Sequence, residues 1–186
     1  MLTSIQLTDE DLLLRPFRLE DAHRLYCAVH ESVRELKPWM SWATEEYSEQ
    51  SARDYLTIAR ARWEEHTFYG FAITRADDIL GACTLSSIHS IYHFCNLGYW
   101  VRTSCHGQGI AGRAAKLVAR FAFEHLGLIR VEIVIAVGNQ ASIRVAEKIE
   151  AHDEGILLNR IVVGKSIYHA HMYSLVPADF DLPARL

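Results

Sequence analysis

Leu97-Gly-Tyr-Trp-Val-Arg-Thr-Ser-Cys-His-Gly-Gln-Gly-Ile-Ala-Gly112 predicts a strand over 97–102, a tight polar turn, a glycine-rich loop and the start of a helix. Gly107 and Gly109 carry no Cβ, so the backbone there can adopt positive φ and turn its N–H groups inward. Inward N–H groups that lead into a helix N-terminus form an anion site, because the donors of the first turn are unpaired and the helix dipole is positive there. The segment therefore predicts a binding site for a phosphorylated ligand.

Two nucleotide-binding motifs share this glycine spacing, and both lack a required residue. Gly107 and Gly112 have the spacing of a Walker A loop, but Arg113 and Ala114 stand where lysine and serine or threonine are needed. A dinucleotide-binding loop requires an acidic residue at the end of the next strand to hold the ribose. Here that strand ends in Ala-Val-Gly at 136–138. Both classes are disfavoured, which leaves another phosphorylated ligand or a glycine-rich loop without a ligand.

The segments around the loop predict alternating strands and helices. Apolar residues recur at helical spacing after the loop until Gly127, a residue type that commonly ends helices. An apolar strand over 129–137 follows, and a strand–helix–strand unit makes a right-handed crossover, so the strands 97–102 and 129–137 should be parallel neighbours. Further strands are expected over 12–15, 68–74, 79–88, 156–163 and 167–175, with helices over 20–37, 48–66 and 139–150. We expect a mixed α/β (α+β) fold in one domain over 1–186, with about seven strands and helices on both faces of the sheet.

Composition excludes several classes of function. The 186 residues are half apolar, and 19 Lys and Arg against 23 Asp and Glu give a net charge of −4, whereas a nucleic-acid-binding domain is normally basic. Residues 1–14 contain no Lys or Arg, which argues against a signal peptide, and no apolar run reaches membrane-spanning length. The cysteines show no CxxC spacing, which is typical of free thiols in a reducing cytoplasm. They are Cys27, Cys83, Cys95 and Cys105.

The glycine loop also carries a family resemblance. His106-Gly-Gln-Gly-Ile-Ala111 resembles the Arg/Gln-x-x-Gly-x-Gly/Ala loop of the GNAT superfamily of acetyl-coenzyme A-dependent N-acetyltransferases. The resemblance implies that the loop amides hold the pyrophosphate of coenzyme A. His106 stands where arginine or glutamine is usual in that loop, so a side-chain contact there is less expected than the backbone contacts.

A second motif follows the next strand. By itself, Asn139 with Ser142 three residues later is a helix cap. Together with Val145, Glu147 and Lys148, however, the series resembles the ribosomal-protein N-acetyltransferase (RimL/RimJ-like) branch of the superfamily. The same branch is matched by Leu-Gly-Tyr-Trp at 97–100, by Arg-Pro-Phe-Arg-Leu-Glu-Asp-Ala at 15–22 and by Tyr-His-x-His-x-Tyr-Ser-Leu at 168–175. The branch usually has glycine and an aromatic residue where this chain has Glu150 and Ala151.

The resemblance implies roles for particular residues. The two parallel strands would splay apart, with the pantetheine arm in the gap between them, Asn139 on its amide and Ser142 on the sulfur. Ser142 is therefore the expected catalytic residue. The residues expected to bind acetyl-coenzyme A are Tyr99, Trp100, Val101, Arg102, His106, Gly107, Gln108, Gly109, Ile110, Ala111, Gly112, Asn139 and Ser142.

The implied reaction is direct attack of an amine on the thioester. A thiol has a pKa near ~8.5, so protonating the thiolate at pH 7 is worth only about 2 kcal/mol. One oxyanion donor is worth roughly 2.7–4 kcal/mol. Backbone N–H groups of the strand at 99–102 should therefore matter more than Ser142. No general base is identified: the branch position for it falls near Asn159, Arg160 and Ile161, and the alternatives before the central strand are His89, Tyr92, His93 and Asn96.

Three further features carry alternatives. His169 and His171 share one face of a strand, but no third ligand supports a metal site, so no metal is expected. Cys105 precedes a helix N-terminus, yet no histidine framework for an acyl-cysteine mechanism is identifiable. The connector from Trp39 to Trp42 either closes the edge of the core or forms a wall of the acceptor pocket.

We therefore expect an acetyltransferase that uses acetyl-coenzyme A and acts on a protein N-terminal α-amine, with a ribosomal protein as the first-choice acceptor. Two alternatives are an acetyltransferase for a small amine or antibiotic, and a coenzyme A-binding regulatory module without turnover. The expected location is the cytoplasm, without nucleic acid or membrane partners, and a homodimer is left open.

Overall fold

A computed structural model describes residues 5–184 of the chain. Within this range eight strands form one sheet in the order β1-β2-β3-β4-β5-β6-β8-β7. Neighbouring strands are antiparallel except β5 and β6, which are parallel. The strands are β1 (Leu7–Asp9), β2 (Leu12–Pro16), β3 (Tyr69–Arg75), β4 (Asp78–His89), β5 (Phe94–Val101), β6 (Arg130–Ala136), β7 (His152–Val163) and β8 (Ser166–Leu175).

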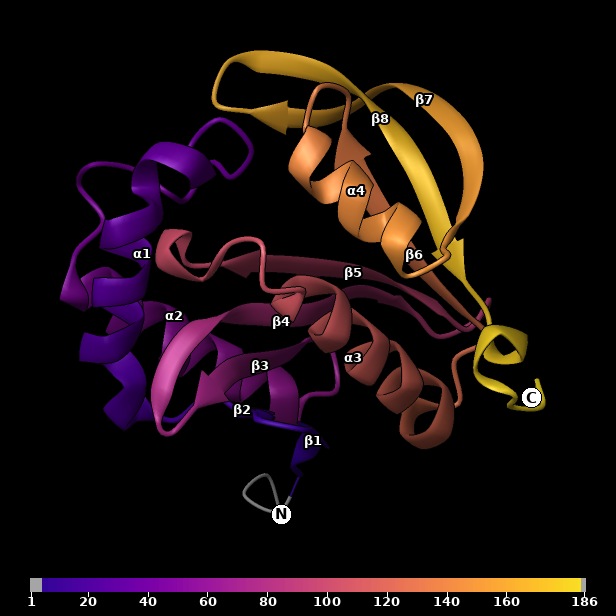
Figure 1. The fold of residues 1–186 in the computed structure, drawn as a ribbon, viewed down its shortest axis with the longest axis horizontal. Helices are drawn as coiled ribbons and strands as arrows, with labels where there is room; N and C mark the ends of the chain where they lie inside the picture. Colours follow the sequence, from indigo (N-terminus) through magenta and orange to yellow (C-terminus); the bar gives the residue numbers. More distant parts are fainter. Residues whose placement is uncertain (1–4, 185–186) are drawn as a thin grey trace.

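The helices cover both faces of this sheet. They are α1 (Ala22–Leu36), α2 (Glu49–Glu64), α3 (Ile110–Leu126) and α4 (Gln140–Lys148). Side chains of a strand alternate between the two faces, so Trp100 of β5 packs with α1, whereas Leu97 and Val101 pack on the side of α3. Figure 1 shows α1 and α2 together at one end of the sheet and α4 rising beside β6. The expected α/β architecture with helices on both faces is confirmed.

Local sequence signals set the helix ends. Ser48 caps α2, because its hydroxyl accepts the N–H of Ser51. Gly127 ends α3 with φ of 64°, a left-handed conformation that glycine adopts without steric cost. Asn139 caps α4 by accepting the N–H of Ser142. These three predicted ends are confirmed.

The parallel pair is short. β5 and β6 pair only at three positions, Phe94 with Arg130, Cys95 with Val131 and Asn96 with Glu132. Beyond these pairs the strands separate, and β6 continues alongside β8 instead. Figure 1 shows the two strands together at the right of the view and diverging toward the left. The expected splay of the parallel pair is confirmed.

The strands differ from expectation at the edges of the sheet. The described chain has one strand more than the seven expected, β1, which has only three residues and gives almost no periodic signal. β7 begins at His152 rather than at 156, and its pairing with β8 shifts register twice. Gly155 and Asn159 adopt positive φ at these shifts. Such bulges interrupt the alternation of apolar residues, which hides the start of the strand in the sequence.

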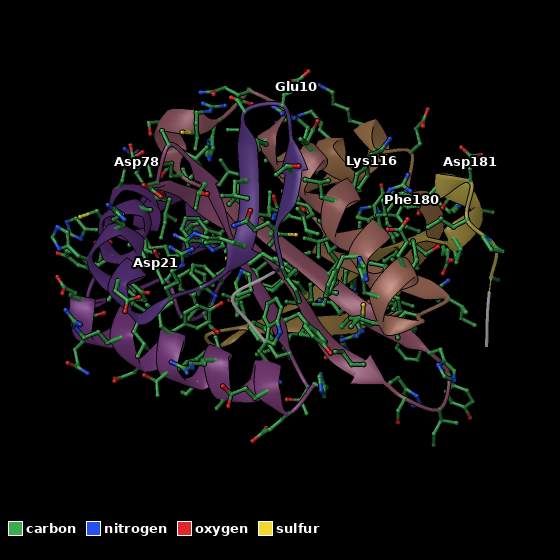
Figure 2. All side chains as sticks on the ribbon, turned by 90° about the horizontal axis from the view of Figure 1, so that it is seen from below. Glu10, Asp21, Asp78, Lys116, Phe180 and Asp181 are labelled. Carbon is green, nitrogen blue, oxygen red and sulfur yellow. The ribbon has the colours of Figure 1, made fainter. Side chains whose placement is uncertain are left out.

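A buried ion pair fixes the start of α1. Arg15 of β2 donates two hydrogen bonds to Asp21, at 2.7 and 2.8 Å, and both side chains are almost completely buried. Burial raises the pKa of Asp21, but the hydrogen bonds from Arg15 and from the Arg18 N–H outweigh this effect and hold that pKa below its usual value. Figure 2 shows Asp21 on the side of α1 and α2, and Lys116 and Phe180 on the side of α3.

Candidate active site

A cleft of about 790 Å³ lies where β5 and β6 separate. Its walls come from β5, β6, the glycine loop, α4 and the segment that follows α1. Eleven of the thirteen residues expected to bind the coenzyme line it. They are Tyr99, Trp100, Val101, His106, Gly107, Gly109, Ile110, Ala111, Gly112, Asn139 and Ser142.

The peptide groups of β5 point alternately toward β4 and toward this cleft. The Arg102 N–H donates to Leu80 O of β4 at 2.7 Å. Because successive peptide groups of a strand point to opposite edges, the N–H groups of Tyr99 and Val101 point away from β4, toward the gap. Within the described residues no strand pairs with this stretch of β5 on that side. Two strand donors are therefore directed into the cleft.

The glycine loop sits at one end of the cleft. Gly107 and Gly109 have φ of 77° and 74°, and Gly109 is the N-cap of α3. The His106 ring donates from Nε2 to Val101 O at 2.9 Å, so this side chain braces the end of β5. Lys148 of α4 lies above the loop: its Nζ is 4.0 Å from the position that a Cβ on Gly109 would occupy. Two glycines in the left-handed conformation, a helix N-terminus and an ammonium thus lie close together, an arrangement that favours an anion.

Ser142, in the first turn of α4, belongs to a small hydrogen-bonded group with Tyr99 and Asn139. The Tyr99 hydroxyl lies 3.0 Å from Ser142 Oγ and 3.2 Å from Ser142 O, so its single hydrogen can be donated to either oxygen. Burial raises the pKa of Tyr99 to about 12, despite the opposing hydrogen bond from Ser142, so the phenol is neutral at physiological pH. Asn139 Oδ1 accepts the Ser142 N–H at 3.2 Å, which leaves the NH₂ group of Asn139 as its remaining donor. Ser142 is therefore held in place at the wall of the cleft.

Two expected residues lie outside the cleft. The Arg102 guanidinium donates from Nε to Glu31 Oε2 of α1 at 3.0 Å, and its N–H is bound to Leu80. Gln108 Oε1 accepts from Arg75 Nη1 at 3.2 Å on the outer side of the loop. Neither residue is among those that line the cleft.

The opposite end of the cleft is formed by the residues that follow α1. Trp39 lines the cleft, and its ring centroid lies 6.2 Å from that of Tyr168 on β8. Trp42 instead packs on Trp100, with ring centroids 6.1 Å apart. Trp39 is therefore a wall of the cleft, whereas Trp42 covers the buried Trp100 from the surface and is itself 43% exposed. Figure 1 shows the β7–β8 hairpin arching over α4 toward this connector.

Sequence reasoning missed several residues of the cleft. Arg144 and Lys148 are four residues apart on α4, so they lie on one face, and both line the cleft with Glu35 of α1. The helical spacing of the two cations could have been read from the sequence. Glu35 could not, because its place depends on the crossing of α1 over β5.

The residues considered as bases before the central strand lie elsewhere. His89 stacks between Tyr92 and Phe94, with ring centroids 4.7 and 4.9 Å apart. Phe94 begins β5 at the paired end, and none of His89, Tyr92, His93 or Asn96 lines the cleft.

Of the two β8 histidines considered for a metal site, His169 has a structural contact. His169 Nδ1 accepts the N–H of Asn159 at the β7 bulge, at 3.0 Å. No group of three or more His, Cys, Asp or Glu side chains arranged for a metal ion occurs between residues 5 and 184. None of the helices in that range is long and apolar enough to cross a membrane.

The chain resembles known bacterial acetyltransferases over almost its whole length. It is 25% identical over 174 residues to the Bacillus subtilis protein named "Putative ribosomal N-acetyltransferase YdaF", which covers 93% of this chain and 95% of that protein. It is 28% identical over 161 residues to "Probable N-acetyltransferase YjcK" of the same species, with 84% and 89% covered.

Solved structures show the same fold. A Vibrio cholerae protein described as a "putative ribosomal-protein-serine acetyltransferase" superposes with a TM-score of 0.84 at 26% identity, over 95% of this chain and 100% of that one. The ribosomal L7/L12 α-N-protein acetyltransferase RimL, solved with coenzyme A, superposes with a TM-score of 0.86 at 20% identity, over 92% and 98%. The sequence model of the acetyltransferase (GNAT) domain matches residues 11–152. The chain therefore belongs to the GNAT family and is an N-acetyltransferase that transfers the acetyl group of acetyl-coenzyme A to an amine.

Proposed function

We propose that this enzyme acetylates the N-terminal α-amine of a protein, with a ribosomal protein as the first candidate. The observation that carries the proposal is the single cleft between β5 and β6, whose lining includes both the glycine loop and Trp39 of the connector after α1. One end suits the coenzyme and the other suits an extended chain end. The names of the Bacillus subtilis and Vibrio cholerae relatives support a ribosomal acceptor.

The coenzyme would lie along the cleft with its pyrophosphate on the glycine loop. Lys148 and the amides of 107–111 supply positive potential there. The pantetheine arm carries amide groups, which can pair with the open edge of β5 as a strand would. Asn139 offers its NH₂ group to the same arm.

The reaction needs donors for the oxyanion and a proton for the departing thiolate. The Tyr99 N–H points into the gap, and the side chain of the same residue contacts Ser142, so we assign it the oxyanion. One such donor is worth roughly 2.7–4 kcal/mol. Ser142 Oγ, held by the neutral Tyr99 hydroxyl, would supply the proton to sulfur. The chemistry therefore rests mainly on geometry.

An α-amine suits this site better than a lysine side chain. An α-amine has a pKa near ~8 and lysine near ~10.4, so at pH 7.5 about a quarter of the former is neutral and about one part in a thousand of the latter. The reaction requires the neutral amine. A site without a strong base therefore favours the acceptor that is already partly neutral.

Matched peptides test the acceptor. One peptide has a free N-terminus, the other a blocked one, and each contains a single lysine. We expect kcat/KM to be far higher for the free peptide, and no measurable turnover of aminoglycosides. Equal rates with the two peptides would contradict the α-amine proposal.

A thermal-shift assay tests the coenzyme site. Coenzyme A should raise Tm, whereas ATP and NAD should not, because the loop lacks the residues that those nucleotides require. Gly109→Val should abolish the shift, since valine is strained at the φ of 74° that Gly109 adopts. Lys148→Ala should reduce the shift without removing it. Equal stabilisation by NAD would contradict the assignment.

We further propose that residues 1–186 act as one domain in the cytoplasm, without nucleic acid or membrane partners. One sheet across the described residues supports the first point. Four unpaired cysteines and a net charge of −4 support the others. The sequence leaves a homodimer open, and light scattering after size-exclusion chromatography would decide it.

A further inference from the structure

The reaction releases a proton from nitrogen. When a neutral amine attacks the thioester, the C–N bond leaves a positive charge on nitrogen, and the amide forms only after that nitrogen loses a proton. A positioned base at hydrogen-bond distance typically accelerates such a step by about 10²- to 10⁴-fold. A base is therefore needed beside the point where the amine meets the thioester.

Glu35 is the only carboxylate among the residues that line the cleft. The other ionisable side chains of the lining either make contacts elsewhere or are cations. His106 donates to Val101 O beside the glycine loop, and Arg144 and Lys148 are cations on α4. The thiol of Cys105 adjoins the same loop.

Glu35 is oriented toward the end of β5. Its Oε2 accepts a hydrogen bond from Thr103 Oγ1 at 3.1 Å. Thr103 follows Val101, whose N–H points into the gap, by two residues. Trp39 and Met40, about one turn beyond Glu35, line the cleft as well. The carboxylate thus lies between the strand that offers the oxyanion donors and the proposed entry of the acceptor.

The position of Glu35 has no evident benefit for the helix itself. It lies in the last turn of α1, where the helix dipole disfavours an acidic side chain. Glu31, one turn earlier, forms an ion pair with Arg102 and accepts a hydrogen bond from the Ser104 N–H. Glu35 has no ion pair among the described residues. The charged and titratable groups around it are Glu31, Arg34 and Lys37 on and after α1, Arg102 before Thr103, and His106, Arg144 and Lys148 across the cleft.

We propose that Glu35 is the catalytic base that accepts the proton of the acceptor nitrogen, an inference that rests on the proposed function. The neutral amine attacks the thioester carbon, and the C–N bond forms. Glu35 takes one proton from the positively charged nitrogen. The C–S bond then breaks, and the thiolate takes a proton from Ser142, which regains one from water. The proton on Glu35 passes to water, which restores the carboxylate. A carboxylate is a weak base, so it suits an amine that enters already neutral.

Three variants test the role of Glu35. Glu35→Gln keeps the shape and can still accept the hydrogen bond from Thr103, but it cannot accept the proton. Its kcat/KM with the free peptide should fall about 10²- to 10⁴-fold at pH 7. The deficit should shrink as pH rises, because hydroxide then takes the proton. Glu35→Asp, which keeps a carboxylate, should restore part of the rate. Thr103→Val should lower it modestly by freeing Glu35.

Glu45→Gln is the matched control. Glu45 is an exposed carboxylate in the same connector, bound to Lys37 at 2.8 Å and not part of the cleft. Its kcat/KM should be unchanged. The Tm shift with coenzyme A should be the same in the wild type and in all four variants, since none touches the glycine loop.

The outcomes separate the two proposals. If the wild type releases no thiol from acetyl-coenzyme A with any amine, the proposed function fails and Glu35 fails with it. If the wild type turns over and Glu35→Gln keeps its kcat/KM, Glu35 alone is wrong. A uniform deficit across pH, or a lost coenzyme shift in Glu35→Gln, would give the residue a structural role and overturn the proposal.

Discussion

Tyr99 and Ser142 act as one hydrogen-bonded unit, although they are 43 residues apart and lie on β5 and α4. The raised pKa of Tyr99 keeps its hydroxyl protonated, so it can hold Ser142 throughout the neutral and moderately alkaline range. Sequence patterns indicated Ser142, but they could not indicate its partner. The contact exists only because α4 lies over the separated end of β5.

Substitutions in this pair should separate chemistry from binding. Ser142→Ala should lower kcat by about 10- to 100-fold, which reaches only the lower limit of the range typical of positioned acids. Tyr99→Phe keeps the buried ring and should give a smaller loss in the same direction. Coenzyme binding, followed by the Tm shift, should persist in both. An unchanged kcat at neutral pH would mean that Ser142 serves only the start of α4 and not the chemistry.

At the scale of elements, the residues after α4 differ from those usual in the branch that the chain resembles. Glu150 follows the helix with φ of 63°, a left-handed conformation that is unfavourable for a side chain with a Cβ. The branch that the sequence resembles usually has glycine here. The structure thus requires the glycine-like conformation although the glycine is absent. Ala151, at the usual aromatic position, packs against the core with a smaller side chain.

Restoring glycine at this position should stabilise the fold. Glu150→Gly removes the left-handed strain, and part of that gain is offset by the greater freedom of glycine in the unfolded chain, so we expect about 0.5–1 kcal/mol. For a chain of this length this corresponds to a rise in Tm of about 1–4 °C. Differential scanning calorimetry would measure it. A lower Tm would mean that the Glu150 side chain contributes more than its backbone costs.

The elements that the sequence predicted well are those with a complete local signal. Helices α2 and α4 begin after Ser48 and Asn139, and α3 ends at Gly127, as expected, because caps act within a few residues. The short strand β1 and the start of β7 were missed, because their pairing depends on distant chain and on bulges. The same limit applies to the site. The loop and Ser142 carry local motifs, whereas Glu35 reaches the cleft only through tertiary packing.

At the scale of the whole molecule, the boundary between β5 and β6 divides the sheet of the described residues into five strands on one side and three on the other. If the pantetheine arm pairs with the separated strands, the coenzyme should protect backbone amides that no protein strand protects. We expect slower hydrogen exchange at Tyr99, Val101 and the facing residues of β6 when coenzyme A is bound. Mass spectrometry of peptic fragments would measure this. Exchange that slowed only at the glycine loop would contradict a ligand between the strands.

The short pairing of β5 with β6 also has a mechanical consequence. The sheet consists of two plates, one of strands β1 to β5 and one of strands β6 to β8. They are joined along a seam of three residue pairs between β5 and β6. β1, near the start of the described chain, is on one plate, and β8, near its end, is on the other. Tension on the chain ends is therefore transmitted across that seam and the helices that flank it. A coenzyme lying in the gap would brace the plates, so occupancy of the cleft and stiffness of the molecule would rise together.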